Sequence, residues 1–137
     1  MATKKQTQNI ENERSAVAVI GGVEYELLLT TRATKEIAKR YGGLENLGDK
    51  LMKSENFEMA LEEIVWLITL LANQSIFIHN LRSSDTREPL TEDEVELLTT
   101  PRELATYKDA ISEAMYRGAA RNIQSEQDSE GKNTPGA

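Results

Sequence analysis

The sequence predicts an α+β fold that is mainly α, with an N-terminal β-hairpin packed on a bundle of about five helices. The hairpin is indicated by residues 17–29, "VAVIGGVEYELLL", in which two β-type segments flank a pair of glycines. The helices are indicated by apolar residues at helical spacing from residue 32 onward and by several helix-capping patterns. A hydrophobic content of 39% is sufficient for one buried core.

The hairpin prediction includes a register. If Gly21-Gly22 form a two-residue primed turn, which requires positive φ angles, Ile20 lies opposite Val23. One face of the hairpin is then apolar and needs helices to cover it, because an isolated hairpin is marginally stable in water. That face carries Ala16, Ala18, Ile20, Val23, Tyr25, Leu27 and Leu29. The opposite face carries two valines and two glutamates, Val17, Val19, Glu24 and Glu26.

Two helices are expected after the hairpin. The first spans about residues 32–41, with Thr30 or Thr31 as its N-cap and Gly42-Gly43 as its stop. The second is short and spans about residues 44–53. The apolar stripe predicted for the first consists of Ala33, Ile37, Ala38 and Tyr41, and that of the second of Leu44, Leu47 and Leu51.

The longest predicted helix spans about residues 56–80 and is apolar on more than one face. Such a helix is usually central, either packed on two sides or placed at a subunit contact. Its main stripe consists of Phe57, Ala60, Leu61, Ile64, Ile68, Leu71 and Ala72. A second set lies off that stripe and consists of Trp66, Leu67, Leu70 and Phe77.

Two capping boxes predict the last two helices. In "TEDE" (residues 91–94) and "TPRE" (residues 100–103), a threonine is followed three residues later by glutamate. The first box begins a short helix whose apolar residues are Val95 and Leu98. The second begins a longer helix, with Pro101 at its first position and an apolar stripe of Leu104, Tyr107, Ile111, Ala114 and Met115.

The two ends of the chain differ from the middle. Residues 1–14 are polar without periodicity, and residues 124–137, "QSEQDSEGKNTPGA", are polar and contain helix breakers. Both ends are therefore predicted to be disordered. A single α+β domain is expected between them, over residues 15–123.

The residue inventory argues against an enzyme. The chain has no cysteine, and His79 is its only histidine, with no neighbour at metal-ligand spacing. The clustered carboxylates fit a solvated helix face and the first turn of a helix, where the helix dipole favours acidic residues. No phosphate-binding glycine loop is present. We expect no catalytic residue, no cofactor and no metal site.

The net charge of −7 argues against a protein that coats nucleic acid or an anionic membrane. The longest apolar run, Ile64–Ala72, covers nine residues, whereas a membrane-spanning helix needs about 20. The expected location is therefore the cytoplasm.

A helix-turn-helix is the alternative interpretation of residues 31–53. Ala38 and Gly42 have the spacing of the small residue and the turn glycine of that motif. The segment carries six basic and three acidic residues, so it is locally positive. Against this interpretation, Gly43 occupies a position that is normally apolar, and Glu45 would oppose the phosphate field. A DNA-binding regulator therefore remains the alternative function.

Four segments, taken in order, carry a family resemblance. The first matches G-x-x-Y-x-L-x-x-T-x-R-A-x-x-E-I from Gly22 and ends in Gly42-Gly43. A Leu-rich short helix, "MALEEIVWLITLLANQ" and "LTEDEVELLTTPRELATYKDAISEAM" follow. This order and spacing, over about residues 15–123, resembles the tail assembly chaperones of long-tailed bacteriophages and prophages.

The resemblance implies a non-enzymatic role in virion morphogenesis. Such proteins bind the tape measure protein and tail tube subunits in the host cytoplasm and are absent from the mature virion. A longer form is often made by ribosomal frameshifting, and Glu130-Gly131-Lys132 can be encoded by a sequence that contains the slippery heptamer G GGA AAG. A structural head–tail or tail component, which would remain in the particle, is a further alternative.

A chaperone of this kind needs exposed apolar residues rimmed by charge. The candidates for partner binding are Val17 and Val19 on the glutamate-bearing face of the hairpin, and Trp66, Leu70 and Phe77 on the second side of the long helix. The alternative is that these residues pack inside the monomer. A homo-oligomer is also compatible with the sequence.

Overall fold

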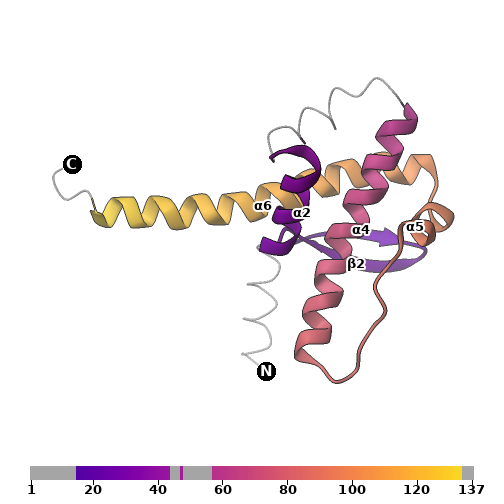
Figure 1. Ribbon diagram of the computed structural model, residues 1–137, viewed down its shortest axis with the longest axis horizontal. Coiled ribbons are helices and arrows are strands. Elements are labelled where there is room, and N and C mark those ends of the chain that lie inside the picture. The colour runs from indigo at the N-terminus through magenta and orange to yellow at the C-terminus, as the bar shows by residue number, and fades with distance from the viewer. Residues whose placement is uncertain (1–14, 44–46, 48–56, 134–137) are drawn as a thin grey trace.

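The computed structural model describes residues 15–43, residue 47 and residues 57–133, and the side chains of residues 16–43, 47 and 60–118. A two-stranded antiparallel hairpin is followed by helices, so the α+β, mainly α prediction is confirmed (Figure 1). The elements are β1 (Ser15–Ile20), β2 (Val23–Leu28), α2 (Thr31–Tyr41), α4 (Phe57–Arg82), α5 (Glu92–Leu98) and α6 (Pro101–Asn133).

The hairpin has the predicted register, with Ile20 opposite Val23. Gly21 and Gly22 have φ angles of 60° and 82°, which are the left-handed values that a primed turn requires. On the apolar face, α4 packs mainly on β2 and α6 packs mainly on β1. The two helices bury Ala16, Ala18, Ile20 and Leu27, whereas Val23 at the turn is 53% exposed.

Helix α2 begins and ends as its sequence indicates. The side-chain oxygen of Thr30 accepts a hydrogen bond of 3.0 Å from the backbone N–H of Ala33. At the other end, Gly42 has a φ of 84°, and its N–H donates to the carbonyl of Ala38 at 2.8 Å. The buried face of α2 consists of Ala33, Ile37 and Tyr41; Ala38, which was predicted to join them, is exposed.

Helix α4 is the central helix of the fold. It contacts the hairpin, α2, α5 and α6, and its buried residues include Ile64, Val65, Leu67, Ile68, Leu71, Ala72 and Ile76. The segment Ala60–Arg82 is long and apolar enough to cross a membrane by these two measures alone. Because 56% of its most apolar window is buried inside the fold, we assign it to the protein core.

Two asparagines of α4 hold the connection between α4 and α5. The buried side chain of Asn73 donates to the carbonyl of Leu90 at 2.9 Å and accepts from the Leu90 N–H at 2.7 Å. One heptad later, Asn80 makes the same pair of bonds with the backbone of Arg87, at 2.8 and 2.7 Å. The carboxamides therefore fix an irregular segment to the helix and satisfy its backbone groups.

Both predicted capping threonines act as N-caps. Thr91 accepts a bond of 3.1 Å from the Glu94 N–H, and the Glu94 carboxylate accepts one of 3.3 Å from the Thr91 N–H. Thr100 accepts a bond of 3.3 Å from the Glu103 N–H. Of the two apolar residues named for this short helix, Val95 is buried, whereas Leu98 is half exposed and lies against Gly21 of the hairpin turn.

The helix prediction differs from the structure in two places. The described residues form four helices rather than about five; the helix predicted over 44–53 lies outside them except for Leu47, which is buried. Helix α6 continues to Asn133, where a disordered tail was predicted from residue 124, and it extends beyond the rest of the fold (Figure 1). Residues 124–133 contain no proline and several glutamate and glutamine residues, so they can prolong a helix that is already nucleated. Residues 1–14 lie outside the described part of the chain.

Candidate functional site

A groove runs along the face of α4 that the hairpin does not cover. Trp66, Leu70 and Phe77 lie on its floor; all three are partly buried. Arg32 and Glu36 of α2 line it on one side and Glu92 of α5 on another, around a hollow of about 340 Å³. Below we call this surface, with these six residues, the α4 groove.

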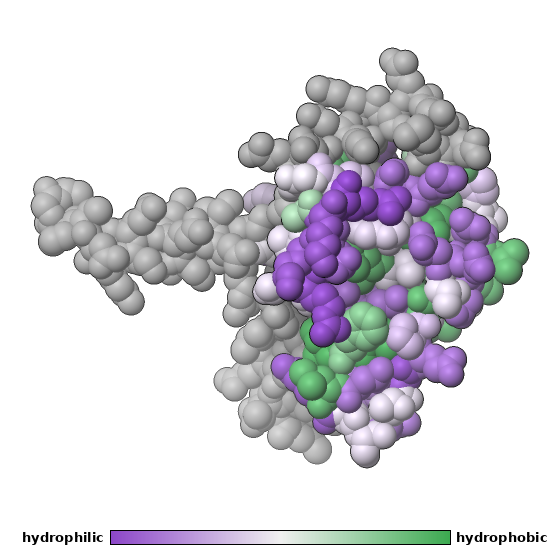
Figure 2. All heavy atoms as spheres, viewed as in Figure 1, coloured by the Kyte–Doolittle hydropathy of each residue, from purple (hydrophilic) through white to green (hydrophobic). Residues whose placement is uncertain are grey.

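The α4 groove continues toward the C-terminal end of α4. A second hollow of about 440 Å³ shares Arg32, Gln74 and Phe77 with the first and extends to Ile78 and Leu81. Leu81 is 85% exposed. Figure 2 shows this face, with hydrophobic side chains over the lower part of α4 beside the hydrophilic side chains of α2.

The polar side chains of the floor are already bonded within the chain. Asn73 uses both its carbonyl and its amino group on Leu90. Gln74 accepts from the Thr30 hydroxyl at 2.5 Å and donates to the Leu70 carbonyl at 3.0 Å. The hydroxyl of Thr69 donates to the carbonyl of Val65 at 2.6 Å. What the floor offers to another molecule is therefore mainly apolar area.

Two arginines of α2 lie over the aromatic rings of α4. The guanidinium of Arg40 is 4.5 Å from the centre of the Trp66 ring, and that of Arg32 is 5.6 Å from the centre of the Phe77 ring. Tyr41 meets Trp66 edge to face, with ring centres 5.9 Å apart. These contacts cover part of each ring and fix its orientation in the groove.

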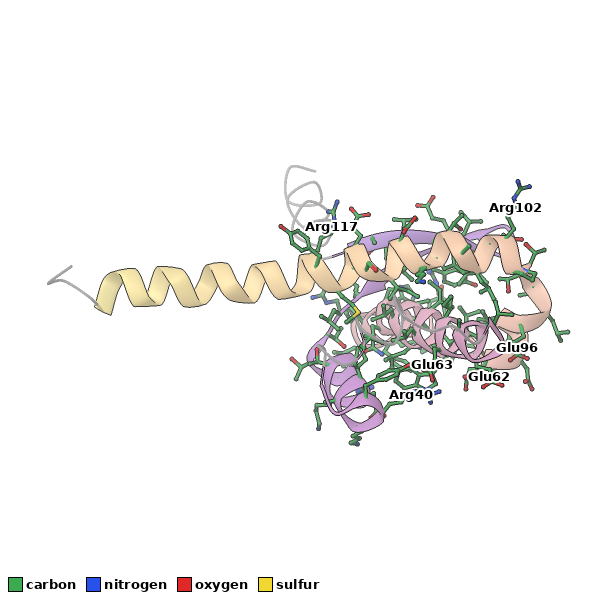
Figure 3. The ribbon with its side chains drawn as sticks, turned by 90° about the horizontal axis from the view of Figure 1, so that it is seen from above. Arg40, Glu62, Glu63, Glu96, Arg102 and Arg117 are labelled. Carbon is green, nitrogen blue, oxygen red and sulfur yellow. The ribbon has the colours of Figure 1, made fainter. Side chains whose placement is uncertain are left out.

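The two arginines differ in their charge partners. Arg40 reaches from α2 to Glu63 of α4, which accepts from its Nε at 3.2 Å and also from the Tyr41 hydroxyl (Figure 3). Arg32, in contrast, lies over the Phe77 ring. Its side chain lines both hollows and therefore lies where they meet in the α4 groove.

The outer face of the hairpin is a second, separate apolar surface. Val17 and Val19 are 47% and 50% exposed and stand opposite Glu26 and Glu24. No hairpin residue lines either hollow of the α4 groove. The structure therefore divides the five candidate residues into two sites: Trp66, Leu70 and Phe77 lie together, and the two valines lie elsewhere.

Helix α6 partly covers the edge of β1. The hydroxyl of Tyr107 donates to the backbone carbonyl of Val19. Burial, followed by the negative charge of Glu103 and a hydrogen bond to it, raises the pKa of Tyr107 to about 12. This bond leaves the side chains of the hairpin's outer face exposed but occupies one backbone acceptor at the strand edge.

A larger hollow, of about 770 Å³, lies between β2 and the C-terminal half of α4. Most of the side chains that line it are charged or polar, and His79 is among them. The ring Nε2 of His79 is 2.8 Å from the backbone oxygen of Asp85, so this histidine holds the connection after α4. Among the described residues, no three Asp, Glu or His side chains lie close enough together to hold a metal ion.

Sequence reasoning missed the charged residues of the α4 groove. Glu92 was assigned only to a capping region, and Arg32 only to a helix start. A local signal did exist for Arg32, because the first turn of a helix disfavours a cation, and α2 has no acidic residue there to offset it.

Two other predicted features, the frameshift region and the second helix of the helix-turn-helix, lie at the end of α6 and mostly outside the described residues, respectively. Glu130, Gly131 and Lys132 lie in the last turn of α6, which ends at Asn133. The second helix of the alternative helix-turn-helix would fall on residues 44–53, outside the described residues except for Leu47. No protein-family model, no curated protein and no solved structure matches this chain.

Proposed function

We propose that this protein is a phage tail assembly chaperone that binds the tape measure protein and tail tube subunits in the host cytoplasm. The order of sequence segments supports this proposal. The structural observation that supports it most is the α4 groove, in which Trp66, Leu70 and Phe77 stay partly exposed on one face of a helix whose other side forms the core. Such a surface suits non-covalent binding of an apolar client.

The charge of the chain fits this role. A protein that binds apolar clients needs a surface that keeps the complex soluble, and the net charge of −7 provides repulsion between complexes. The two exposed valines of the hairpin, flanked by Glu24 and Glu26, would be a second contact surface for the same client or for a tail tube subunit. No bond-making step is part of this proposal.

Co-expression tests the proposal. The tape measure protein of the same phage should be recovered in the soluble fraction with this protein and mainly in the insoluble fraction without it. Purified virions should lack this protein by mass spectrometry. An insoluble tape measure protein in both cases would contradict the proposal, and a stoichiometric amount in virions would favour a structural tail component.

The hairpin's contribution can be measured separately. Replacing Val17 and Val19 by Ser removes apolar area at exposed positions, so the fold should be retained. Reduced recovery of soluble tape measure protein would assign client binding to this surface. Unchanged recovery would eliminate this surface as a site of client binding.

A further inference from the structure

We propose that the α4 groove binds one amphipathic α-helix of a protein partner, oriented by charge. The partner helix carries a Lys or Arg on the flank that faces Glu92 of α5 and an Asp or Glu on the flank that faces Arg32 of α2. This inference rests on the proposed function, because it names the class of client segment that the groove takes. The hydrogen bonding, length and charges of the groove support it.

The hydrogen bonding of the floor favours a helix over an extended peptide. An extended peptide needs hydrogen-bond partners for its backbone, and Asn73 and Gln74, the amide side chains on the floor, are already bonded at both ends. A helix satisfies its own backbone and presents only side chains to the groove. A helix buried against this floor therefore keeps the backbone groups of its interior paired.

The length of the groove fits about four helical turns. The residues that line the two hollows run along α4 from Trp66 to Leu81, which is about 22 Å at 1.5 Å per residue. Trp66, Leu70 and Phe77 follow one stripe of α4 at spacings of four and seven residues. A partner helix with apolar residues at comparable spacing can pack along this stripe, as amphipathic helices do in hydrophobic grooves.

The charges of the groove differ between its two walls. Glu92 lines the first hollow from α5, whereas Arg32 lines both hollows from α2. Glu36, also on α2, is paired with Lys39 at 3.5 Å, and the guanidinium of Arg40 lies over Trp66, so the α2 wall is mainly basic. A helix with a basic side chain on the flank facing α5 and an acidic one on the flank facing Arg32 complements this pattern in one direction, and reversing its direction exchanges the two flanks.

Arg32 is the most informative of these charges. It lies in the first turn of α2, where the helix dipole disfavours a cation. Glu92, by contrast, lies in the first turn of α5, where an acidic residue is favoured locally whether or not a partner exists. A residue that opposes local preference and lines a groove is typical of a binding site.

The protein contains its own reporter. Trp66 is the only tryptophan of the chain and lies on the floor, so its fluorescence responds to occupation of the groove. The test uses the full-length protein and three synthetic Ala-rich peptides of about 15 residues with the same apolar stripe. The first peptide has the proposed charge polarity, the second has the reverse polarity, and the third has the proposed polarity but a central proline, which breaks the helix.

The first peptide should shift the Trp66 emission and bind about tenfold more tightly than either of the others. Arg32→Glu should reduce its affinity by about tenfold. Arg102→Glu is the matched control, because Arg102 is also the second residue of its helix and projects from α6 on the side away from Arg40 (Figure 3). Equal affinity for the three peptides, an absence of binding, or equal effects of the two substitutions would each overturn the proposal.

A failure of the helix-binding inference can be distinguished from a failure of the proposed chaperone function. If the wild-type protein keeps the tape measure protein soluble but does not discriminate between the peptides, the helix-binding inference fails and the chaperone function stands. If the peptides bind as expected but the tape measure protein stays insoluble, the groove is a helix-binding site and the chaperone function fails.

Discussion

At the scale of single residues, the hydrogen bonds of buried polar side chains determine how the floor of the groove is built. Asn73 is the clearest case, because its carboxamide pairs with both backbone groups of Leu90 and thereby fixes the segment that leads into α5. Asn80 does the same for Arg87 at a more exposed position. The two residues therefore allow the stability contribution of the same pair of hydrogen bonds to be compared between a buried and an exposed position.

Replacing Asn73 by Ala should lower the free energy of unfolding by about 2–4 kcal/mol, because it leaves the buried N–H and C=O of Leu90 unpaired. Asn80→Ala should cost about 1 kcal/mol or less, since water can replace the side chain there. Chemical denaturation of both variants measures the difference. Equal losses would mean that burial does not decide the strength of these bonds.

Tyr107 predicts a pH dependence of stability. Its pKa is raised from the usual value near 10 to about 12 in the folded protein, first by burial and then by Glu103. The folded state holds this proton more tightly than the unfolded chain does. The contribution to stability is therefore fully present below pH 10 and is lost as the pH rises toward 12.

The free energy of unfolding should accordingly fall between about pH 10 and pH 12 more steeply in the wild type than in Tyr107→Phe. The Phe variant also lacks the hydrogen bond to Val19, so it should be less stable at neutral pH. Parallel curves for the two proteins across this range would show that Tyr107 is not the group responsible.

At the scale of elements, the close approach of α6 to Leu29 explains why a glycine, Gly118, lies within this helix although glycine disfavours helices. Gly118 lies inside α6, where Ala is normally favoured by about 1 kcal/mol. A Cβ atom at this position would lie 2.9 Å from the Cβ of Leu29, at the end of the hairpin. The glycine therefore allows α6 to pass directly over the connection between β2 and α2.

Gly118→Ala should destabilise the protein by about 1–3 kcal/mol despite its better helix propensity, because the Leu29 Cβ is fixed to the backbone and cannot rotate away. Ser112→Ala, at an exposed position of the same helix, is the control and should be neutral or stabilising by a few tenths of a kcal/mol. Thermal unfolding measures both. A stabilised Gly118→Ala protein would contradict the packing of α6 on Leu29.

At the scale of the whole molecule, the features predicted correctly are those set by local sequence. The turn glycines, the alternation of β1 and β2, and the capping threonines each depend on neighbours within a few residues. The features that were missed depend on contacts between distant parts of the chain. The Asn73–Leu90 pairing, the exposure of Leu98 beside Gly21, and the charged residues of the α4 groove are examples.

The candidate site was predicted in part for the same reason. Helical periodicity indicated that Trp66, Leu70 and Phe77 lie off the main buried stripe, and the structure places them together on one floor. Periodicity could not show that α2 and α5 leave this floor open, because that depends on how three helices are placed in space. It also could not separate the floor from the hairpin valines.

The central claim is that the α4 groove is the surface that keeps the client soluble, and one substitution tests it most directly. Soluble tape measure protein should be quantified after co-expression with the wild type, with Leu70→Glu and with Ala105→Glu, which adds the same charge at an exposed position of α6. All three proteins must first be shown to be folded by their unfolding curves. The account predicts that soluble client is lost with Leu70→Glu but not with the wild type or with Ala105→Glu. A folded Leu70→Glu protein that solubilises the client as well as the wild type does would contradict it.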